Sequence, residues 1–223
     1  MRNKNLLVRC SELSKIMTKS RSKTSPLGDT TKSYVQQKAK EDFYGISPNF
    51  SNKYTEKGIM NEPLGIELIN QTQFVDYKKN EERITNDWLT GECDINCSNK
   101  IIDIKCSWSF DTFPVFQEEA EKSVKKSGYD WQLRGYMLLY NKPKAEVVYC
   151  LTQTPPELLS SFDSIELHDV DHIKPEDRMT VVKIERDEIK ESEMLSQYNL
   201  ANEYYQECIT ELENKNKLIL TEK

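Results

Sequence analysis

The sequence predicts a mixed α/β fold, in which helices flank a small central β-sheet and a long helix follows at the C-terminal end. Three observations lead to this prediction. Helical patterns alternate along the chain with short β-branched runs. The 223 residues are enough to bury a core, and 37% hydrophobic with 30% charged residues is typical of a folded globular domain. Residues 187–215 repeat apolar side chains at helical spacing.

Each element follows from its local pattern. Helices are expected over residues 10–18, 34–43, 55–72, 116–126, 129–141 and 187–215. Ser11 is the predicted N-cap of the first helix. Strands are expected over residues 73–78, 87–96, 101–107, 145–153 and 177–186, the first of them at a sheet edge. The order of these elements favours one sheet whose strands are connected by helices.

The predicted domain organisation is a body over residues 1–186 and a C-terminal helix over 187–223. The body contains a core of motifs over 55–153 and a basic segment over 1–57. Apolar side chains of the C-terminal helix form a seam with spacing of three and four, made of Met194, Tyr198, Ala201, Tyr205, Cys208 and Leu212. We expect this seam to pack on the body of the domain; the alternative is a contact in an oligomer.

Charge is spread unevenly along the chain. The formal net charge is −6, but residues 1–57 carry +7 and residues 155–223 carry −9. The basic segment interleaves serine and threonine with lysine and arginine, which suits either a loop or a surface that binds phosphates. No run of 18 apolar residues occurs, and the first residues contain only a short apolar stretch. We therefore expect no transmembrane helix, no secretory signal and a cytoplasmic location.

The most informative stretch is residues 88–108, where two strand patterns flank a turn centred on Ser98 and Asn99. This register pairs Asp94 with Asp103, Glu92 with Lys105, and Ile95 with Ile102. Strand side chains alternate between the two faces of a sheet, so all four charged residues share one face. The other face is predicted to join the core through Cys93, Ile95, Ile102, Ile104 and Cys106.

Two carboxylates opposite each other on a hairpin point to chemistry. Their Cβ atoms would lie about 4.5–5.5 Å apart, where like charges destabilise the pairing. A proton or a cation would relieve this repulsion, and hard oxygen ligands suit Mg²⁺ or Mn²⁺. Lys105 on the same face can neutralise developing phosphate charge or orient a water molecule. The alternative is an ordinary charged strand face in contact with solvent.

Two helix residues add to this pattern. Glu62 falls on the apolar stripe of Ile59, Ile66 and Ile69, where a carboxylate needs a partner such as the predicted metal. The alternative is that Pro63 makes Glu62 an exposed N-cap. Gln132 is the one amide on the buried stripe of residues 129–140. One interpretation is that Gln132 reaches the metal-bound water or a phosphate. The other is that it is a core glutamine with its hydrogen bonds satisfied inside the protein.

Together these residues resemble the PD-(D/E)xK nuclease superfamily, and more closely its phage lambda exonuclease and YqaJ-like viral recombinase branch. The resemblance spans roughly residues 8–141. Its motifs occur in the family's order: Lys57-Gly58 before Glu62, then Asp94, then Asp103-Ile104-Lys105, then the helix of Gln132. Departures from the family pattern are Cys93 in place of the proline, Asp103 in place of the commoner glutamate, and Pro63 after Glu62.

The resemblance implies Mg²⁺-dependent hydrolysis of DNA phosphodiester bonds, with Mn²⁺ as a substitute. Asp94, Asp103 and the Ile104 carbonyl would hold the metal, with help from Glu62. Lys105 would position and activate the water, supported by Gln132. A further set, from the family's opening segment, would approach DNA phosphates: Arg9, Ser11 and Lys15. Ordinary surface charge and a helix cap are the alternative for that set.

In the lambda-type branch, such enzymes digest one strand of double-stranded DNA from its end, 5′ to 3′. They are typically ring-shaped trimers that work beside a single-strand annealing protein in phage recombination. Two other functions remain open from the residues alone. One is a structure-specific or repair endonuclease on the same fold. The other is a non-catalytic DNA-binding subunit, against which the retained acidic pair argues.

Overall fold

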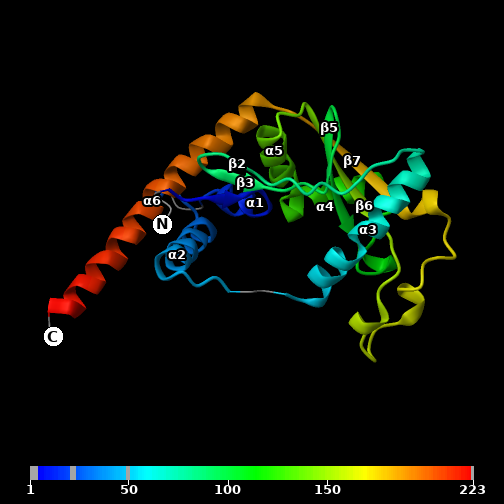
Figure 1. Ribbon diagram of the computed structural model, residues 1–223, viewed down its shortest axis with the longest axis horizontal. Coiled ribbons are helices and arrows are strands. Elements are labelled where there is room, and N and C mark those ends of the chain that lie inside the picture. Colours follow the sequence, from blue (N-terminus) through cyan, green and yellow to red (C-terminus); the bar gives the residue numbers. More distant parts are fainter. Residues whose placement is uncertain (1–4, 21–23, 49–50, 222–223) are drawn as a thin grey trace. The chain divides into compact units, whose positions relative to one another are not determined.

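The computed structural model describes residues 5–20, 24–48 and 51–221, including backbone but not side chains over 216–221 (Figure 1). The chain forms two compact units, each of which is described by itself. Unit 1 comprises the described residues of 1–49, 84–91 and 187–223. Unit 2 comprises those of 50–83 and 92–186. Parts of the basic segment, residues 1–4, 21–23 and 49–50, lie outside the described residues. The predicted domain boundaries stay a prediction.

Unit 2 is built on a four-stranded mixed sheet with the order β4-β5-β6-β7. Its strands are β4 (Ile95–Asn96), β5 (Lys100–Cys106), β6 (Lys144–Cys150) and β7 (Met179–Glu185). Strand β5 runs antiparallel to β4 and parallel to β6, and β7 closes the sheet antiparallel to β6. Ile95 pairs with Ile102, which confirms the hairpin register predicted from the sequence.

Helix α3 (Lys53–Gln73) covers one face of this sheet (Figure 1). Its buried Ile66 and Ile69 pack in one core cluster with Ile95, Ile102 and Ile104, as expected for the apolar face of the hairpin. Helix and sheet approach closely at Gly65, where an added Cβ would lie only 2.8 Å from the Ile104 side chain. Glycine at this position therefore lets α3 carry its polar residues against β5.

Helices α4 (Gln117–Ser127) and α5 (Tyr129–Leu139) cover the opposite face. One residue separates them: Gly128, which ends α4 in the left-handed region at φ 73°. The turn is therefore tight, and α5 begins at Tyr129. Leu133 and Tyr136 of α5 are buried. Short 3-10 turns make up part of the connections: η2 (Phe110–Thr112), η3 (Pro156–Leu158), η4 (Ile165–Leu167) and η5 (Pro175–Arg178).

Unit 1 joins segments that are distant in sequence. A three-stranded sheet has the order β1-β3-β2, with β1 (Val8–Arg9) parallel and β2 (Ile84–Thr85) antiparallel to β3 (Leu89–Gly91). Its helices are η1 (Cys10–Glu12), α1 (Leu13–Ile16), α2 (Asp29–Tyr44) and α6 (Glu188–Thr221).

The predicted seam of α6 packs within unit 1, mainly on α2. Met194, Ala201 and Tyr205 are almost fully buried, and the Tyr205 hydroxyl donates to Asp42 of α2 at 2.7 Å. Trp88 stacks beside Tyr198 with ring centroids 4.9 Å apart. These contacts all lie within unit 1.

The predicted edge strand over residues 73–78 is wrong. Helix α3 ends at Phe74, which adopts the left-handed region at φ 54°. The side chain of Asn70 then accepts from the Tyr77 amide at 2.8 Å and donates to the Tyr77 carbonyl at 2.9 Å. Because a side chain satisfies both backbone groups, this segment needs no strand partner.

The strand predicted over residues 87–96 is two strands in different sheets, β3 and β4. Between them, Asn80 holds the backbone: its amide donates to the Asp94 carbonyl at 2.7 Å, and its side chain donates to the Cys93 carbonyl at 3.0 Å. The ladder with β5 therefore ends at Ile95. The predicted pairing of Glu92 with Lys105 is wrong, and Glu92 instead forms an ion pair with Arg83 at 3.1 Å.

The first helix also differs from its prediction. Residues 10–18 form the turn η1 followed by the single turn α1, and Ser11 caps neither. Arg9 precedes η1 and Glu12 precedes α1, neither with a side-chain capping bond. The second helix begins earlier than expected, at Asp29 after Gly28, because Gly28 provides an extended N-cap.

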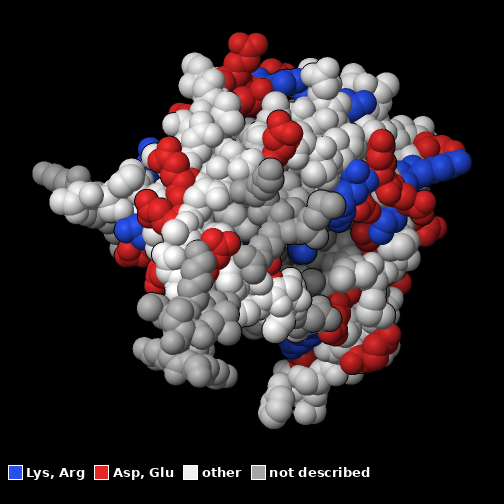
Figure 2. All heavy atoms as spheres, turned by 60° about the vertical axis from the view of Figure 1, so that its left-hand side comes forward, with Lys and Arg blue, Asp and Glu red and all other residues white. Residues whose placement is uncertain are grey.

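On the face drawn in Figure 2, basic side chains of the described residues lie in small groups among acidic ones. The described residues form no broad basic surface on that face. No helix in the described part of the chain is both long and apolar enough to cross a membrane.

Candidate active site

One cavity of unit 2, about 610 Å³ in volume, collects the charged residues predicted from the hairpin. It is lined by the second half of β5, the first half of α3 and the start of α5. Its polar lining includes Glu62, Asp94, Asp103, Lys105 and Gln132. Ile104 also lines it. The tertiary structure thus brings together all the candidate catalytic and metal-binding residues of this unit.

Asp94 is positioned by the edge of the hairpin. Its Oδ2 accepts a hydrogen bond from the Ile104 amide at 2.6 Å, so the side chain lies across β5 between Asp103 and Lys105. Removal from water raises the pKa of Asp94, and the negative charge of Asp103 raises it further. The repulsion expected between the two aspartates is therefore present.

Asp103 is buried at 2% exposure and has two polar side-chain partners, Gln132 and Lys105. Its Oδ1 accepts from the Gln132 side chain at 3.0 Å, and Gln132 also donates to the Tyr136 hydroxyl at 3.1 Å. Its Oδ2 lies 2.6 Å from the Lys105 ammonium. Gln132 thus holds one oxygen of Asp103, and the other faces the Lys105 ammonium.

Lys105 lies between a carboxylate and an aromatic ring. Its Nζ is 2.6 Å from Asp103 and 4.4 Å from the centre of the Tyr129 ring. Burial lowers the pKa of Lys105, but Asp103 and then Tyr129 raise it more, so the net pKa is above its ordinary range. The side chain is therefore an ammonium group at neutral pH.

Glu62 lies inside a continuous helix. Its predicted alternative, an N-cap before Pro63, is wrong because Asn52 caps α3 by accepting from the amides of Tyr54 and Thr55 at 3.0 Å each. The stripe prediction holds for Ile66 and Ile69 but not for Ile59, which is 67% exposed and lies at the cavity.

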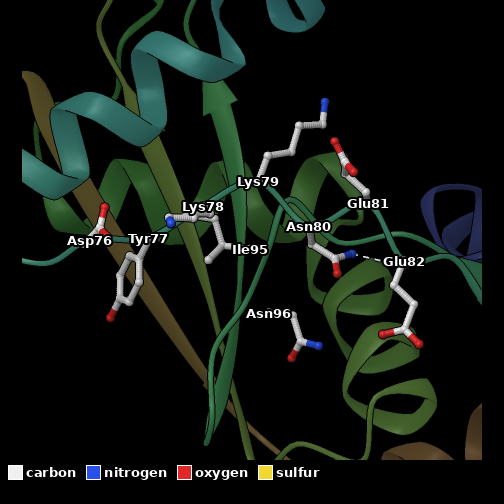
Figure 3. A pocket seen from close by; sticks show the side chains of 9 residues that line it. All are labelled: Asp76, Tyr77, Lys78, Lys79, Asn80, Glu81, Glu82, Ile95 and Asn96. Atoms are coloured by element: carbon white, nitrogen blue, oxygen red, sulfur yellow. Dashed lines mark hydrogen bonds between the residues drawn. The ribbon is translucent and has the colours of Figure 1, made fainter.

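Glu62 has a partner that the sequence pattern did not identify. Lys79, in the loop of residues 75–83, lies 3.0 Å from its Oε1 and donates to its Oε2 at 3.2 Å. Figure 3 shows the same loop beside a second cavity of unit 2, about 670 Å³ in volume, which Lys79 and Asn80 both line. The Asn80 side chain donates there to the Glu82 carbonyl at 3.0 Å. Only the tertiary structure reveals this role, since Lys79 belongs to an ordinary polar run in the sequence.

Two buried oxygens give a test of whether this site suits a cation. Asp103 Oδ2 and Glu62 Oε1 are buried and accept no hydrogen bond of regular geometry. Each faces a lysine ammonium instead, from Lys105 and Lys79. Carboxylate oxygens are hard ligands, and buried ones that already face a cation fit Mg²⁺ or Mn²⁺. Across the described residues, no three His, Cys, Asp or Glu side chains converge as a metal-binding group.

The three predicted phosphate-binding residues belong to unit 1. Arg9 ends β1, and Ser11 lies in η1; both are exposed. Lys15 forms an ion pair with Glu12 at 3.1 Å and lies 5.2 Å from the centre of the Tyr34 ring. Their role toward DNA stays a prediction.

Comparison with known proteins identifies the family. No family model matches the chain, and no curated protein matches it. Among solved structures, a phage-related exonuclease from Haemophilus somnus 129PT matches with a TM-score of 0.87 and 39% sequence identity, over 93% of this chain and 97% of that chain. The chain belongs to the phage-related exonucleases. The predicted family and the predicted α/β fold are confirmed.

The exonuclease fold extends to a more distant structure. An alkaline exonuclease from Laribacter hongkongensis, LHK-Exo, matches with a TM-score of 0.67 at 14% identity, over 96% of this chain and 94% of that chain. Its complex with dAMP matches with a TM-score of 0.64 at 15% identity and the same coverage of both chains. At these identities the likeness shows the fold alone.

Proposed function

We propose that this exonuclease hydrolyses phosphodiester bonds of double-stranded DNA from an end, in a reaction that depends on Mg²⁺ or Mn²⁺. The observation that carries the proposal is the half-buried Asp94 next to the buried Asp103, with Lys105 beside them. Such a pair is costly for folding alone, because two carboxylates share a site from which water is largely removed. A phosphodiester nuclease needs this arrangement, and membership in the exonuclease family supports it.

Asp94, Asp103 and the Ile104 carbonyl would hold the metal, with Glu62 contributing directly or through water. A divalent ion bound there would supply Lewis-acid polarisation of a phosphoryl oxygen and a more acidic bound water. The remaining roles belong to the chain. Lys105 supplies a positive charge for the negative charge that develops on the phosphate, and it orients a water molecule. Gln132 keeps Asp103 in place through its hydrogen bond.

The finer parts of the proposal rest on the family resemblance. These parts are 5′-to-3′ polarity, action in phage-type recombination beside a single-strand annealing protein, assembly into a ring-shaped trimer, and a cytoplasmic location. Arg9, Ser11 and Lys15 would approach DNA phosphates, and the basic segment of residues 1–57 is suited to line the DNA path. A net charge of −6 is compatible with this, because only the DNA path has to be basic.

The test compares end-labelled linear duplex with covalently closed circles of the same sequence, with Mg²⁺ and with EDTA. We expect rapid release of nucleotides from the linear DNA with Mg²⁺, and none from the circles. Equal cleavage of circles would favour the alternative, a structure-specific or repair endonuclease. Tight duplex binding without cleavage under any metal condition would favour a non-catalytic DNA-binding subunit.

A further inference from the structure

The cavity that holds the acidic pair also has an apolar rim, formed by Tyr54, Ile59 and Trp108. Tyr54 is 59% exposed and Ile59 is 67% exposed, although both belong to the helix that carries Glu62. A site that binds only phosphate and metal has no use for exposed apolar surface. This rim therefore indicates a second kind of contact with the substrate.

Trp108 has neighbours on both its backbone and its ring at this rim. Its carbonyl accepts from the Lys57 ammonium at 2.9 Å and from the Thr154 hydroxyl at 2.9 Å. The Tyr54 ring meets the indole edge to face at a centroid distance of 5.1 Å, and the Lys53 ammonium lies 4.5 Å from the centre of the indole. A fixed aromatic group loses little entropy when a flat ligand stacks on its cluster.

Lys57, which supports Trp108, is a charged side chain whose burial costs free energy. Lys57 is fully buried, and its three acceptors are all uncharged: the carbonyls of Trp108 and Thr152 and the hydroxyl of Thr154. Burial lowers the pKa of Lys57 to about 8. An apolar side chain would be less expensive to bury here, so the lysine is better explained by what it positions. What it positions is the segment that follows β5 and carries Trp108.

The substrate offers one group that is both flat and weakly polar, the nucleobase. Aromatic side chains stack on bases of any sequence, which suits an enzyme that has to digest every sequence. Inside a duplex both faces of a base are already stacked, so only an unstacked base can reach such a rim. We propose that Tyr54, Ile59 and Trp108 form a nucleobase subsite, which takes one unstacked base of the strand whose phosphodiester lies at the aspartates. This inference rests on the proposed function.

The test measures binding without cleavage. A short oligothymidylate and an abasic oligomer of equal length carry the same phosphates, but only the first carries bases. Their affinities for the full chain are measured by fluorescence anisotropy in EDTA. We expect the wild-type protein to prefer the oligothymidylate by about fivefold or more. Equal affinity for both oligomers would overturn the subsite.

Variants locate the preference. Tyr54→Ala removes a mostly exposed side chain and should reduce the preference to about twofold or less, whereas Tyr54→Phe keeps the flat ring and should retain it. Phe162→Ala is the matched control, because Phe162 is 97% exposed in the same unit and does not line this cavity. A full preference in Tyr54→Ala, or its loss in Phe162→Ala, would overturn the assignment to the rim.

The same preparation is tested for cleavage of plain linear duplex, which separates the two ideas. Cleavage by a protein that ignores bases would overturn the subsite and leave the proposed function intact. Absence of cleavage under every metal condition would overturn the proposed function, and the subsite's part in catalysis with it.

Discussion

Each half of strand β5 carries a lysine between a carboxylate and a tyrosine, but the number of carboxylates near that lysine differs. In the first half, Lys100 pairs with Glu146 at 2.7 Å and lies 5.7 Å from the centre of the Tyr77 ring. In the second half, Lys105 pairs with Asp103 at 2.6 Å and lies 4.4 Å from the centre of the Tyr129 ring. A lysine between a carboxylate and a tyrosine is therefore not in itself the sign of an active site.

The difference lies in the surplus of carboxylates. Glu146 has one lysine, and the pair is balanced. Near Lys105 there are Asp94 and Glu62 as well, so acids outnumber the lysines even when Lys79 is included. A balanced pair stabilises the sheet, whereas a surplus of buried negative charge needs a further cation. The second half of β5 is therefore the reactive one, and substitutions in the two halves should have different consequences.

The largest difference is expected for the two carboxylates. Asp103→Asn should reduce cleavage of linear duplex at least about a hundredfold, because it removes a charged metal ligand. Duplex binding should be kept or improved, since no phosphate contact is lost. Cleavage is measured with end-labelled DNA and binding by anisotropy in EDTA.

Its counterpart in the balanced half is Glu146→Gln. This variant should cleave at a rate within about twofold of wild type, because Glu146 does not line the cavity of the acidic pair. It should melt at a lower temperature, since Lys100 loses its partner. Unchanged cleavage in Asp103→Asn would contradict the metal-site proposal.

The two lysines give the next comparison. Lys105→Met should reduce the rate of cleavage about a hundredfold, because a group that stabilises charge in the transition state is lost. Lys100→Met should leave the rate nearly unchanged and lower only the thermal stability. Single-turnover rates and melting curves of both variants decide the matter; equal losses of rate would remove the distinction between the halves.

Metal and pH should act on the acidic half alone. Burial and the charge of Asp103 hold the pKa of Asp94 above its ordinary value. The protonated form of Asp94 thus favours the folded state at low pH, and this stability is lost as the pH rises from the ordinary aspartate range through the raised pKa. A divalent ion binds the deprotonated pair. It should therefore stabilise the folded state more at high pH than at low pH.

Thermal melting with and without Mg²⁺ measures this effect. At a tenfold excess over its dissociation constant, Mg²⁺ should raise the melting temperature by about 3–6 °C at pH 8. The rise should nearly vanish near pH 5. Asp103→Asn should abolish it, and Glu146→Gln should retain it. A rise that is independent of pH would contradict the link to Asp94.

The smallest effect is expected at Lys79, the partner of Glu62. Its side chain is 49% exposed, so Lys79→Met should change the free energy of unfolding by less than about 1 kcal/mol. Removal of its charge frees Glu62, and Mg²⁺ should then bind about two- to fivefold more tightly in the melting titration. Lys78→Met is the control from the same loop. Weaker Mg²⁺ binding in Lys79→Met would show that Lys79 positions Glu62 rather than competing with the metal.

Local patterns were sufficient for most elements and for the hairpin. The register of β4 and β5 follows from the alternation of apolar and polar side chains and from the Ser98-Asn99 turn. The structure shows this register in the pairing of Ile95 with Ile102. Local patterns failed where a residue from another segment forms hydrogen bonds with backbone groups. Asn70 satisfied the segment predicted as a strand, and Asn80 ended the ladder before Glu92.

By itself, the sequence determined that Asp94, Asp103 and Lys105 come together at the end of a two-stranded hairpin. The reason is that side chains in a strand alternate with a period of two, and the turn fixes which residues oppose each other. Only the tertiary structure decided which groups from other elements meet them: Gln132 at Asp103, Lys79 at Glu62, and the aromatic rim supported by Lys57. Those contacts depend on how helices pack over the sheet, as at Gly65, and no short-range pattern encodes that distance.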